Sequence, residues 1–177
     1  MMDITMVTGG VRSGKSRWAQ DEAARLGGSQ VTVVATAEAV DEEMRSRIEA
    51  HRLHRPEGWI TIEAHQDVGS AILAAETEVV VVDCLTVLTG MALGRSSAET
   101  ESQALVAMEV EIDSLLAACE ARDGRLIVVT NEVGLSVHPA TAVGRWFQDG
   151  LGAANQRVAR AADRVVLMVS GVELKLR

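Results

Sequence analysis

A glycine-rich segment near the amino end carries the strongest chemical signal in the chain. Residues 9–16 read Gly-Gly-Val-Arg-Ser-Gly-Lys-Ser and fit the pattern G-x-x-x-x-G-K-[ST]. Glycines at these positions let the backbone curl around a phosphate with its N–H groups pointing inward. In such a loop Lys15 reaches the β- and γ-phosphates of a nucleoside triphosphate, and the Ser16 hydroxyl ligates Mg²⁺. An apolar run before the segment and a helical pattern after it favour this interpretation over a glycine-rich turn without a ligand.

A second signal is an acid at the end of an apolar run. Residues 79–82 are four valines, and Asp83 follows them. An acid at the carboxyl end of a buried strand is where proteins with such a loop hold Mg²⁺, so Ser16 and Asp83 are the predicted metal ligands. Alone, Asp83 could equally end a strand in a turn. The guanine-reading pattern N-K-x-D is absent, because the nearest string, at residues 130–133, lacks its Lys and Asp.

A third signal is a basic segment with a histidine inside it. Residues 45–55 hold four Arg and one Glu, in a chain whose net charge is −8. Guanidinium groups pair bidentately with phosphate oxygens, so the segment suits a polyphosphate. The neutral imidazole of His51 can attack phosphorus, and nearby arginines favour that neutral form. Two structural alternatives stay open: a half-buried histidine beside Met44 and Ile48 on one helical face, or a solvated basic face.

The elements that must position these residues alternate between strands and helices. Nearly unbroken apolar runs, typical of parallel strands covered on both faces, predict strands at residues 4–7, 31–35, 79–82, 126–130 and 165–169, with a weaker one at 59–62. Helical patterns predict helices from after Gly14 to Leu26, from near Asp41, and at residues 67–75, 101–121 and 141–162. Residues 94–98 are the most loop-like stretch, and Trp59 can anchor the chain beyond the basic segment. We expect an α/β three-layer sandwich with a mainly parallel central sheet, in one domain over residues 1–177.

Composition excludes several classes of protein. The chain has 177 residues, and 47% of them are hydrophobic, which excludes a disordered chain. Its acidic charge and its few aromatic residues, three Trp and one Phe, argue against nucleic acid as a partner. Cys84 and Cys119 predict no disulfide framework, and they form no zinc pattern with the histidines. We see no signal peptide and no apolar run long enough for a membrane span, so the expected location is the cytoplasm. Only Lys15 and Lys175 are lysines among the 17 basic residues.

Taken together, these motifs resemble a known family, the bifunctional adenosylcobinamide kinase/adenosylcobinamide-phosphate guanylyltransferases of cobalamin biosynthesis. The matching strings span nearly the whole chain and lie at residues 8–16, 35–37, 41–44, 47–48, 51–52, 55–56, 59, 83–86, 130–134, 155–156 and 169–171. The histidine segment and the Thr-Asn-Glu-Val-Gly string at 130–134 are more specific than the phosphate loop. Residues 87–91 depart from the usual family pattern.

The resemblance implies a P-loop NTPase fold of RecA-like type, a homo-oligomer, and two reactions. A nucleoside triphosphate, ATP or GTP, would phosphorylate adenosylcobinamide with Mg²⁺ and Lys15. The family histidine falls on His51, three residues after Ile48 and four before Arg55, and it would carry GMP from GTP to adenosylcobinamide phosphate. The same matching implies nucleotide contacts at Gly9, Gly10, Val11, Arg12, Ser13, Gly14, Lys15, Ser16, Thr36, Ala37, Glu38, Arg52, Leu53, His54, Arg55, Glu63 and Asp83.

Two other functions remain compatible with the residues. One is a P-loop kinase of another small molecule, in which His51 is structural. The other is a RecA-like nucleotide-binding switch or assembly protein. The absence of the N-K-x-D string argues against a guanine-nucleotide switch in particular.

Overall fold

In the computed structural model, residues 1–39, 41–53 and 55–177 are described, without the side chains of residues 43, 47, 50, 51 and 53. Over these residues seven strands form one sheet in the order β3-β2-β4-β5-β1-β6-β7. All neighbouring pairs are parallel except β6 with β7. The strands are β1 (Met2–Gly9), β2 (Val31–Ala35), β3 (Ile60–Glu63), β4 (Val79–Asp83), β5 (Gly124–Val129), β6 (Arg164–Val169) and β7 (Val172–Lys175).

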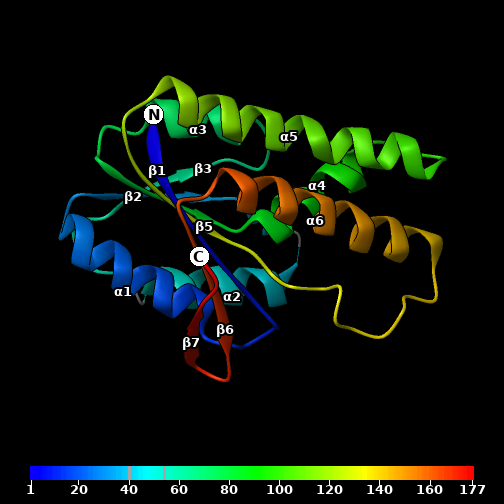
Figure 1. Cartoon of the computed structure of the whole chain (residues 1–177), viewed down its shortest axis with the longest axis horizontal. Coiled ribbons are helices and arrows are strands. Elements are labelled where there is room, and N and C mark those ends of the chain that lie inside the picture. The colour runs from blue at the N-terminus through cyan, green and yellow to red at the C-terminus, as the bar shows by residue number, and fades with distance from the viewer. Residues whose placement is uncertain (40, 54) are drawn as a thin grey trace.

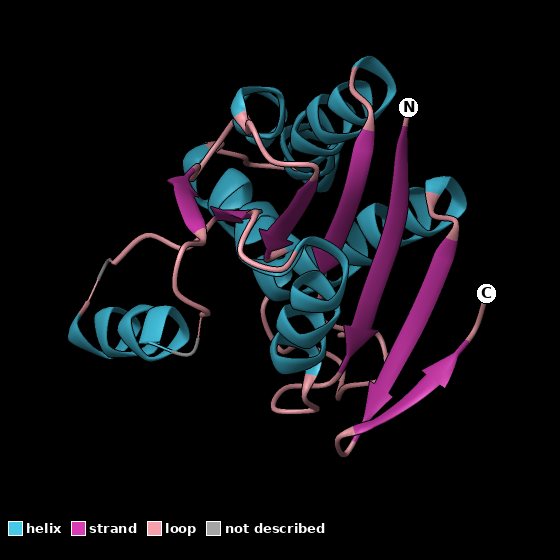
Figure 2. Ribbon diagram, turned by 90° about the vertical axis from the view of Figure 1, so that its left-hand side faces the viewer, coloured by secondary structure: helices cyan, strands magenta, loops and turns pink. Residues whose placement is uncertain are grey.

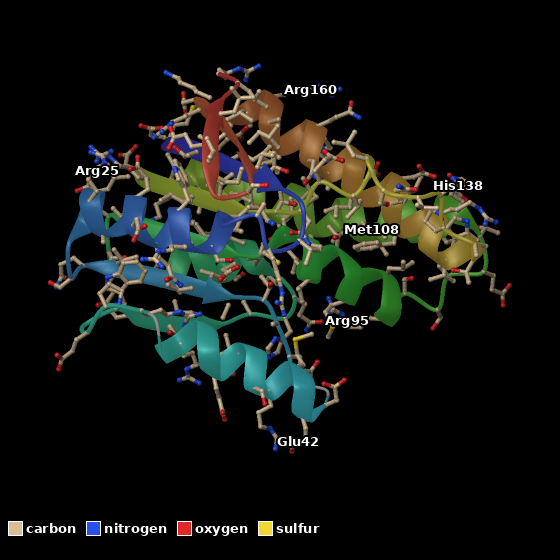
Figure 3. The ribbon with its side chains drawn as sticks, turned by 90° about the horizontal axis from the view of Figure 1, so that it is seen from below. Arg25, Glu42, Arg95, Met108, His138 and Arg160 are labelled. Carbon is tan, nitrogen blue, oxygen red and sulfur yellow. The ribbon has the colours of Figure 1, made fainter. Side chains whose placement is uncertain are left out.

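Helices cover the sheet unequally on its two faces (Figure 1). One face packs against α1, and the other carries the layer that contains α3, α4, α5 and α6. Figures 2 and 3 show α2, which begins at Glu42, standing off from this sandwich beyond the carboxyl ends of the strands. The helices are α1 (Lys15–Gly27), α2 (Glu42–Leu53), α3 (Val68–Ala74), α4 (Leu85–Arg95), α5 (Glu101–Ala121) and α6 (Ala142–Ala161).

The central strands bury both faces, which is why their sequences are continuously apolar. In β4, Val79 and Val81 pack in the core on the α1 side, whereas Val80 and Val82 pack in the core under the other helices. Successive side chains of a strand point to opposite faces, so a strand between two helix layers needs an apolar residue at every position. The predicted α/β sandwich with a mainly parallel sheet is thereby confirmed.

Most predicted elements are confirmed, with three differences. The sequence patterns did not predict α4 or the short edge strand β7. Residues 94 and 95 belong to the last turn of α4, so the loop expected at 94–98 begins only after Arg95, where the Ser96 hydroxyl bonds to the Leu93 carbonyl at 2.7 Å. The pattern of α4 is hard to recognise because its residues are apolar nearly all round, since it packs against both α5 and α6.

Candidate functional site

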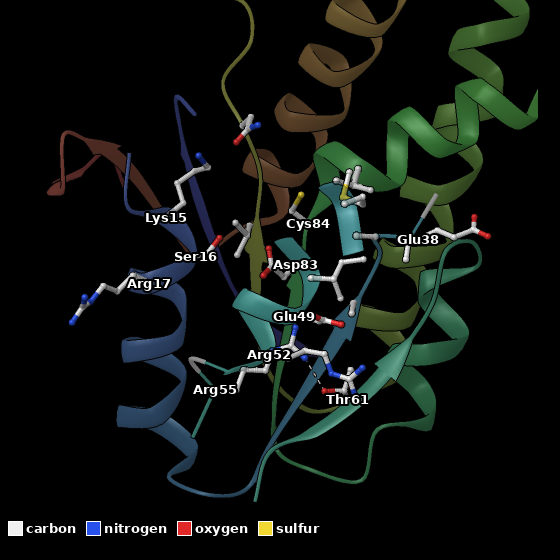
Figure 4. Close-up of a pocket in the computed structure, with 18 of the residues that line it drawn as sticks. Lys15, Ser16, Arg17, Glu38, Glu49, Arg52, Arg55, Thr61, Asp83 and Cys84 are labelled. Atoms are coloured by element: carbon white, nitrogen blue, oxygen red, sulfur yellow. Dashed lines mark hydrogen bonds between the residues drawn. The ribbon is translucent and has the colours of Figure 1, made fainter. Parts of the chain in front are cut away.

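A cavity of about 930 Å³ lies at the carboxyl ends of the parallel strands. Ligands of open α/β sheets bind at this edge, because the loops that leave the strands converge there. Five parts of the chain form most of its wall: the loop between β1 and α1, the residues after β2, one side of α2, the segment from Arg55 through β3 to His65, and the ends of β4 and β5 (Figure 4). The geometry therefore brings the phosphate loop and the basic segment to one site.

The phosphate loop needs its first and last glycines for different reasons. Gly9 has a φ of +148°, and a Cβ there would collide with the Met168 carbonyl of β6. Gly14 has a φ of +101° and occupies the N-cap position of α1. Only glycine adopts such conformations without strain, so both residues let the chain turn sharply from β1 into the helix. The amino end of α1, with its positive dipole end, consequently faces the cavity.

Lys15 is buried at the first position of α1, with its ammonium group folded over the loop. Its Nζ donates to the Gly10 carbonyl at 2.5 Å and lies 3.4 Å from the Ser13 hydroxyl. Burial lowers the pKa of the Lys15 ammonium, while Cys84 and Asp83 act in the opposite direction. Because burial raises the pKa of the Cys84 thiol to about 11, the thiol is neutral at pH 7 and Asp83 is the effective counter-charge.

Ser16 and Asp83, the predicted metal ligands, both line the cavity (Figure 4). Among the described residues, no group of three His, Cys, Asp or Glu side chains could hold a metal ion by itself. Mg²⁺ is usually held by one or two protein oxygens together with water and substrate phosphates. One hydroxyl and one carboxylate beside a phosphate loop therefore fit Mg²⁺ that arrives with a nucleotide.

Arg55, which also lines the cavity, has a guanidinium group that is only partly hydrogen-bonded among the described residues. Its Nη1 donates to the Thr61 hydroxyl at 2.8 Å, whereas its Nε is buried without a hydrogen-bond partner in the described part of the chain. Burial lowers the pKa of the Arg55 guanidinium, nearby Asp83 raises it, and Arg52 lowers it. Arg52 in turn lies 3.7 Å from the Glu63 carboxylate. A buried guanidinium with an unused donor is suited to an anionic ligand.

Beyond Arg55, Trp59 anchors the chain to the body of the protein, as expected. Its indole donates to the Gly28 carbonyl at 3.0 Å, and its ring packs against the core on the α1 side. The basic segment is thus fixed at one end close to the sheet.

Most of the predicted nucleotide contacts meet in this cavity. Those that line it are Val11, Arg12, Ser13, Gly14, Lys15, Ser16, Ala37, Glu38, Arg52, Arg55, Glu63 and Asp83. Gly9 and Gly10 begin the loop outside the lining. Thr36 is fully buried behind it, where its hydroxyl donates to the Cys84 carbonyl and accepts from the Cys84 N–H. The contact of each of these residues with a nucleotide stays a prediction.

The histidine segment is only partly described. Residue 51 lies on α2, three residues after Ile48 and seven after Met44, which both line the cavity. The side chains of His51 and Leu53 lie outside the described part of the structure, as does the whole of His54. The choice between a nucleophilic and a structural His51 therefore stays a prediction from the sequence.

Several cavity residues were missed by the sequence interpretation. Thr61, His65, Cys84 and Asn131 all belong to or follow strands that end at this edge. The Nδ1 of His65 lies 3.2 Å from the Thr36 carbonyl, and the Arg95 guanidinium donates to the backbone carbonyl of His65 at 2.8 Å. A search of the residues after each predicted strand would have listed His65, Cys84 and Asn131, because parallel strands share one carboxyl edge. Thr61 lies within β3 and would not have been found in this way.

The strand–phosphate loop–helix unit defines the class of the protein. The loop follows β1, Asp83 ends β4, and β5 lies between these two strands in the sheet. This is the arrangement of a P-loop NTPase of RecA-like type, which the family resemblance implied.

Comparison with known proteins then gives the family. Residues 5–176 match the family described as cobinamide kinase / cobinamide phosphate guanyltransferase. The chain is 41% identical to the bifunctional adenosylcobalamin biosynthesis protein CobU of Escherichia coli, over 98% of this chain and 99% of that one. It is 36% identical to the corresponding protein CobP of Pseudomonas aeruginosa, over 97% and 96% of the two chains. The chain belongs to this family, and the predicted family and enzyme class are confirmed.

Two further findings concern the fold and the membrane. The flagellar accessory protein FlaH of Methanocaldococcus jannaschii is similar in structure with a TM-score of 0.47 and 12% identity, over 99% of this chain and 78% of that one. Within the described residues, none of the helices has the length and apolar character to cross a membrane.

Proposed function

We propose that the protein phosphorylates adenosylcobinamide with a nucleoside triphosphate, and then transfers GMP from GTP to adenosylcobinamide phosphate through a His51–GMP intermediate. One observation carries the proposal: the same cavity is lined by the phosphate loop and by Arg45 and Arg52 of α2, in a chain whose family is named for both activities. The product of the two reactions is adenosylcobinamide-GDP.

In the kinase reaction, the aminopropanol hydroxyl oxygen of adenosylcobinamide attacks the γ-phosphorus of the triphosphate. The bond from that phosphorus to the β–γ bridging oxygen breaks, the nucleoside diphosphate leaves, and the hydroxyl proton passes to water. Lys15 and the N–H groups at the start of α1 stabilise the negative charge on the phosphate oxygens. Bound Mg²⁺ would neutralise phosphate charge between Ser16 and Asp83.

In the guanylyl transfer, a ring nitrogen of His51 attacks the α-phosphorus of GTP. The bond between this phosphorus and the α–β bridging oxygen breaks, and pyrophosphate leaves. A phosphate oxygen of adenosylcobinamide phosphate then attacks the same phosphorus, and the electron pair of the N–P bond returns to the imidazole. Arg52, on α2, and Arg55, just beyond it, supply positive charge beside this chemistry, because both line the cavity.

Labelling with GTP that is radioactive at the α-phosphate tests the guanylyl half. We expect a label on the denatured protein that is stable to alkali and labile to acid, as a phosphoramidate is. His51→Ala abolishes this label and leaves phosphorylation of adenosylcobinamide largely intact. His138→Ala, in the loop before α6, is the matched control and keeps the label. A wild-type protein that never acquires label during turnover contradicts the intermediate, and a His51→Ala variant that loses both activities assigns His51 a structural role.

Substitution of the phosphate-loop lysine tests the kinase half. We expect Lys15→Ala to lower the rate of adenosylcobinamide phosphorylation by about 10²–10³-fold, the usual effect of deleting one donor to a developing charge. Full kinase activity in this variant would contradict the role of the loop. Phosphorylation of another alcohol by the wild-type protein, in place of adenosylcobinamide, would support the alternative small-molecule kinase.

We also propose a domain organisation, a location, a phosphoryl donor and an oligomeric state for the enzyme. A single domain of the whole chain carries both reactions in the cytoplasm, with ATP or GTP as phosphoryl donor and without a nucleic-acid partner. Assembly into a homo-oligomer is supported by exposed apolar side chains on the edge hairpin, among them Val169, Val172 and Leu174. Light scattering during size-exclusion chromatography measures the assembly directly.

A further inference from the structure

The segment that follows β5 has a position that the proposed function does not yet use. Its hydrogen bonds extend the sheet beside β1: the Thr130 N–H donates to the Val7 carbonyl, and the Glu132 N–H to the Gly9 carbonyl, each at 3.0 Å. Asn131 therefore lies level with the entrance of the phosphate loop. Because β5 runs between β1 and β4, Asn131 also follows the strand between the loop and Asp83.

The alternation of side chains directs Asn131 toward the cavity. Val129 packs on the α1 side, and the next residue, Thr130, is buried on the other side, where its hydroxyl bonds to Asn155. Successive residues of an extended chain face opposite ways, so residue 131 faces the α1 side again. Val129 and Asn131 accordingly line the cavity.

A buried polar network fixes the backbone of Asn131. Its N–H donates to the Thr86 hydroxyl at 2.7 Å, and its carbonyl accepts from Asn155 Nδ2 at 2.9 Å. The other amide atom of Asn155, Oδ1, accepts from the Thr130 hydroxyl at 2.7 Å. Asn155 and Thr130 are 7% and 0% exposed, so each of these groups had to be desolvated to make the network. Such networks hold the groups around them in one orientation.

The side-chain amide of Asn131, in contrast, makes no hydrogen bond within the described part of the protein. This neutral amide lines the same cavity as Lys15 and Asp83, on a backbone that hydrogen bonds hold in place, and a phosphate is the ligand that suits it. Its Nδ2 can donate to a phosphate oxygen without adding charge, beside a lysine that already supplies it.

We infer that Asn131 is a catalytic residue whose amide donates a hydrogen bond to the terminal phosphate of the bound nucleoside triphosphate, and that Thr86 and Asn155 are its positioning residues. The inference rests on the proposed phosphoryl transfer, and it identifies which phosphate is read at this position. The amide contacts the phosphoryl group that is transferred, so it stabilises the charge that group carries in the transition state.

Binding of fluorescent GTP and GDP in the presence of Mg²⁺ tests the contact without any corrinoid. We expect Asn131→Ala to weaken GTP binding about 10-fold and to change GDP binding by less than about twofold, because GDP lacks the terminal phosphate. Asn131→Asp weakens GTP binding further, since it places a carboxylate against that phosphate. Gln30→Ala, which deletes an exposed amide at the opposite edge of the sheet, is the control and changes neither affinity.

The alternatives give different results. Equal losses of GTP and GDP affinity, or no loss at all, overturn the contact with the terminal phosphate. The variants should fold, because the bonds to Thr86 and Asn155 use only the backbone of residue 131. An unchanged melting temperature of the ligand-free Asn131→Asp variant checks this. If adenosylcobinamide proves not to be the substrate, the nucleotide affinities still decide the role of Asn131.

The positioning role of Thr86 needs a different measurement. We expect Thr86→Val to lower kcat of phosphorylation about 10-fold or more with little change in KM for adenosylcobinamide, because the freed N–H lets residue 131 move. Thr86→Ser keeps the hydroxyl and should recover most of the rate. A Ser variant as slow as the Val variant, or a loss confined to KM, contradicts a positioning role.

Discussion

At the residue scale, the Arg55 guanidinium combines burial with an unused donor. Its Nη1 is occupied by Thr61, and its buried Nε has no partner in the described structure. We expect Arg55→Lys to weaken GTP binding about 10-fold, because an ammonium cannot reproduce the planar pair of donors and a hydrogen bond to a charged group contributes about 1.5–3 kcal/mol. Titration with a fluorescent GTP analogue measures the change.

The control for this substitution is Arg160→Lys, at an exposed position near the end of α6. It makes the same chemical change on a surface remote from the cavity lining and should leave GTP affinity unaltered. An Arg55→Lys variant that binds GTP as tightly as the wild type would show that its unused donor serves the fold instead of the ligand.

At the element scale, close approach of α3 and α5 depends on a missing side chain. A Cβ at Gly69 would collide with the carbonyl and hydroxyl oxygens of Ser114. We expect Gly69→Ala to lower the free energy of unfolding by about 1–3 kcal/mol, the usual cost of overpacking. Gly152→Ala on α6 is the matched control, because nothing lies within 4 Å of its Cβ position. It should raise stability by about 0.5–1 kcal/mol through helix propensity. Urea unfolding measures both changes, and a tolerated alanine at position 69 would contradict the close approach.

The N-cap of α3 gives the fold a predictable response to acid. Hydrogen bonds from the Ser70 and Ser114 hydroxyls, followed by the Ser70 N–H, lower the pKa of the Asp67 carboxyl. A carboxyl with a lowered pKa in the folded state stabilises the fold above its unfolded pKa, near 3.9, and loses this effect as the pH falls through the folded value. We expect Asp67→Ala to cost about 1 kcal/mol at pH 6.

The difference between wild type and Asp67→Ala should therefore shrink as the pH is lowered below about 4. Urea unfolding at a series of pH values follows it. Glu120→Ala, an exposed acid near the end of α5, serves as the comparison. A difference that stays constant with pH would show that the Asp67 carboxylate charge contributes nothing to the cap.

The sequence predicts those elements whose pattern is local in the chain, and it does not predict features that depend on how distant segments pack together. The phosphate loop was predictable because its glycines and its lysine are adjacent in the chain, and β4 because four valines need no partner to be recognised. The roles of Asn131 and Thr61 could not be assigned from the sequence, because they depend on which strands are neighbours in the sheet. The turn before β7, with Ser170 and Gly171 at positive φ, was a hairpin signal that could have predicted that strand.

At the scale of the whole molecule, the charge of the cavity lining is opposite in sign to the net charge of the chain. The chain carries a net charge of −8, yet the described cavity lining has six basic and four acidic side chains. A triphosphate therefore approaches an acidic molecule and meets a locally basic surface. Salt distinguishes these two effects. At 0.1 M ionic strength, interactions between charges more than about 10 Å apart are largely screened, so added salt weakens the distant acidic charges first.

Thermal unfolding with GTP and Mg²⁺ tests which effect decides binding. At a free concentration about 100 times Kd, the ligand should add about 2.7 kcal/mol, which raises the Tm of a chain of this size by about 5–10 °C. Removal of Mg²⁺ with a chelator should reduce this shift, since Ser16 and Asp83 would hold the ion only together with the phosphates. If the local arginines dominate, raising the salt at constant GTP lowers the shift, because their attraction is screened. A shift that grows with salt would mean that repulsion from the acidic surface outweighs the basic cavity, and would contradict a binding site built on Arg52 and Arg55.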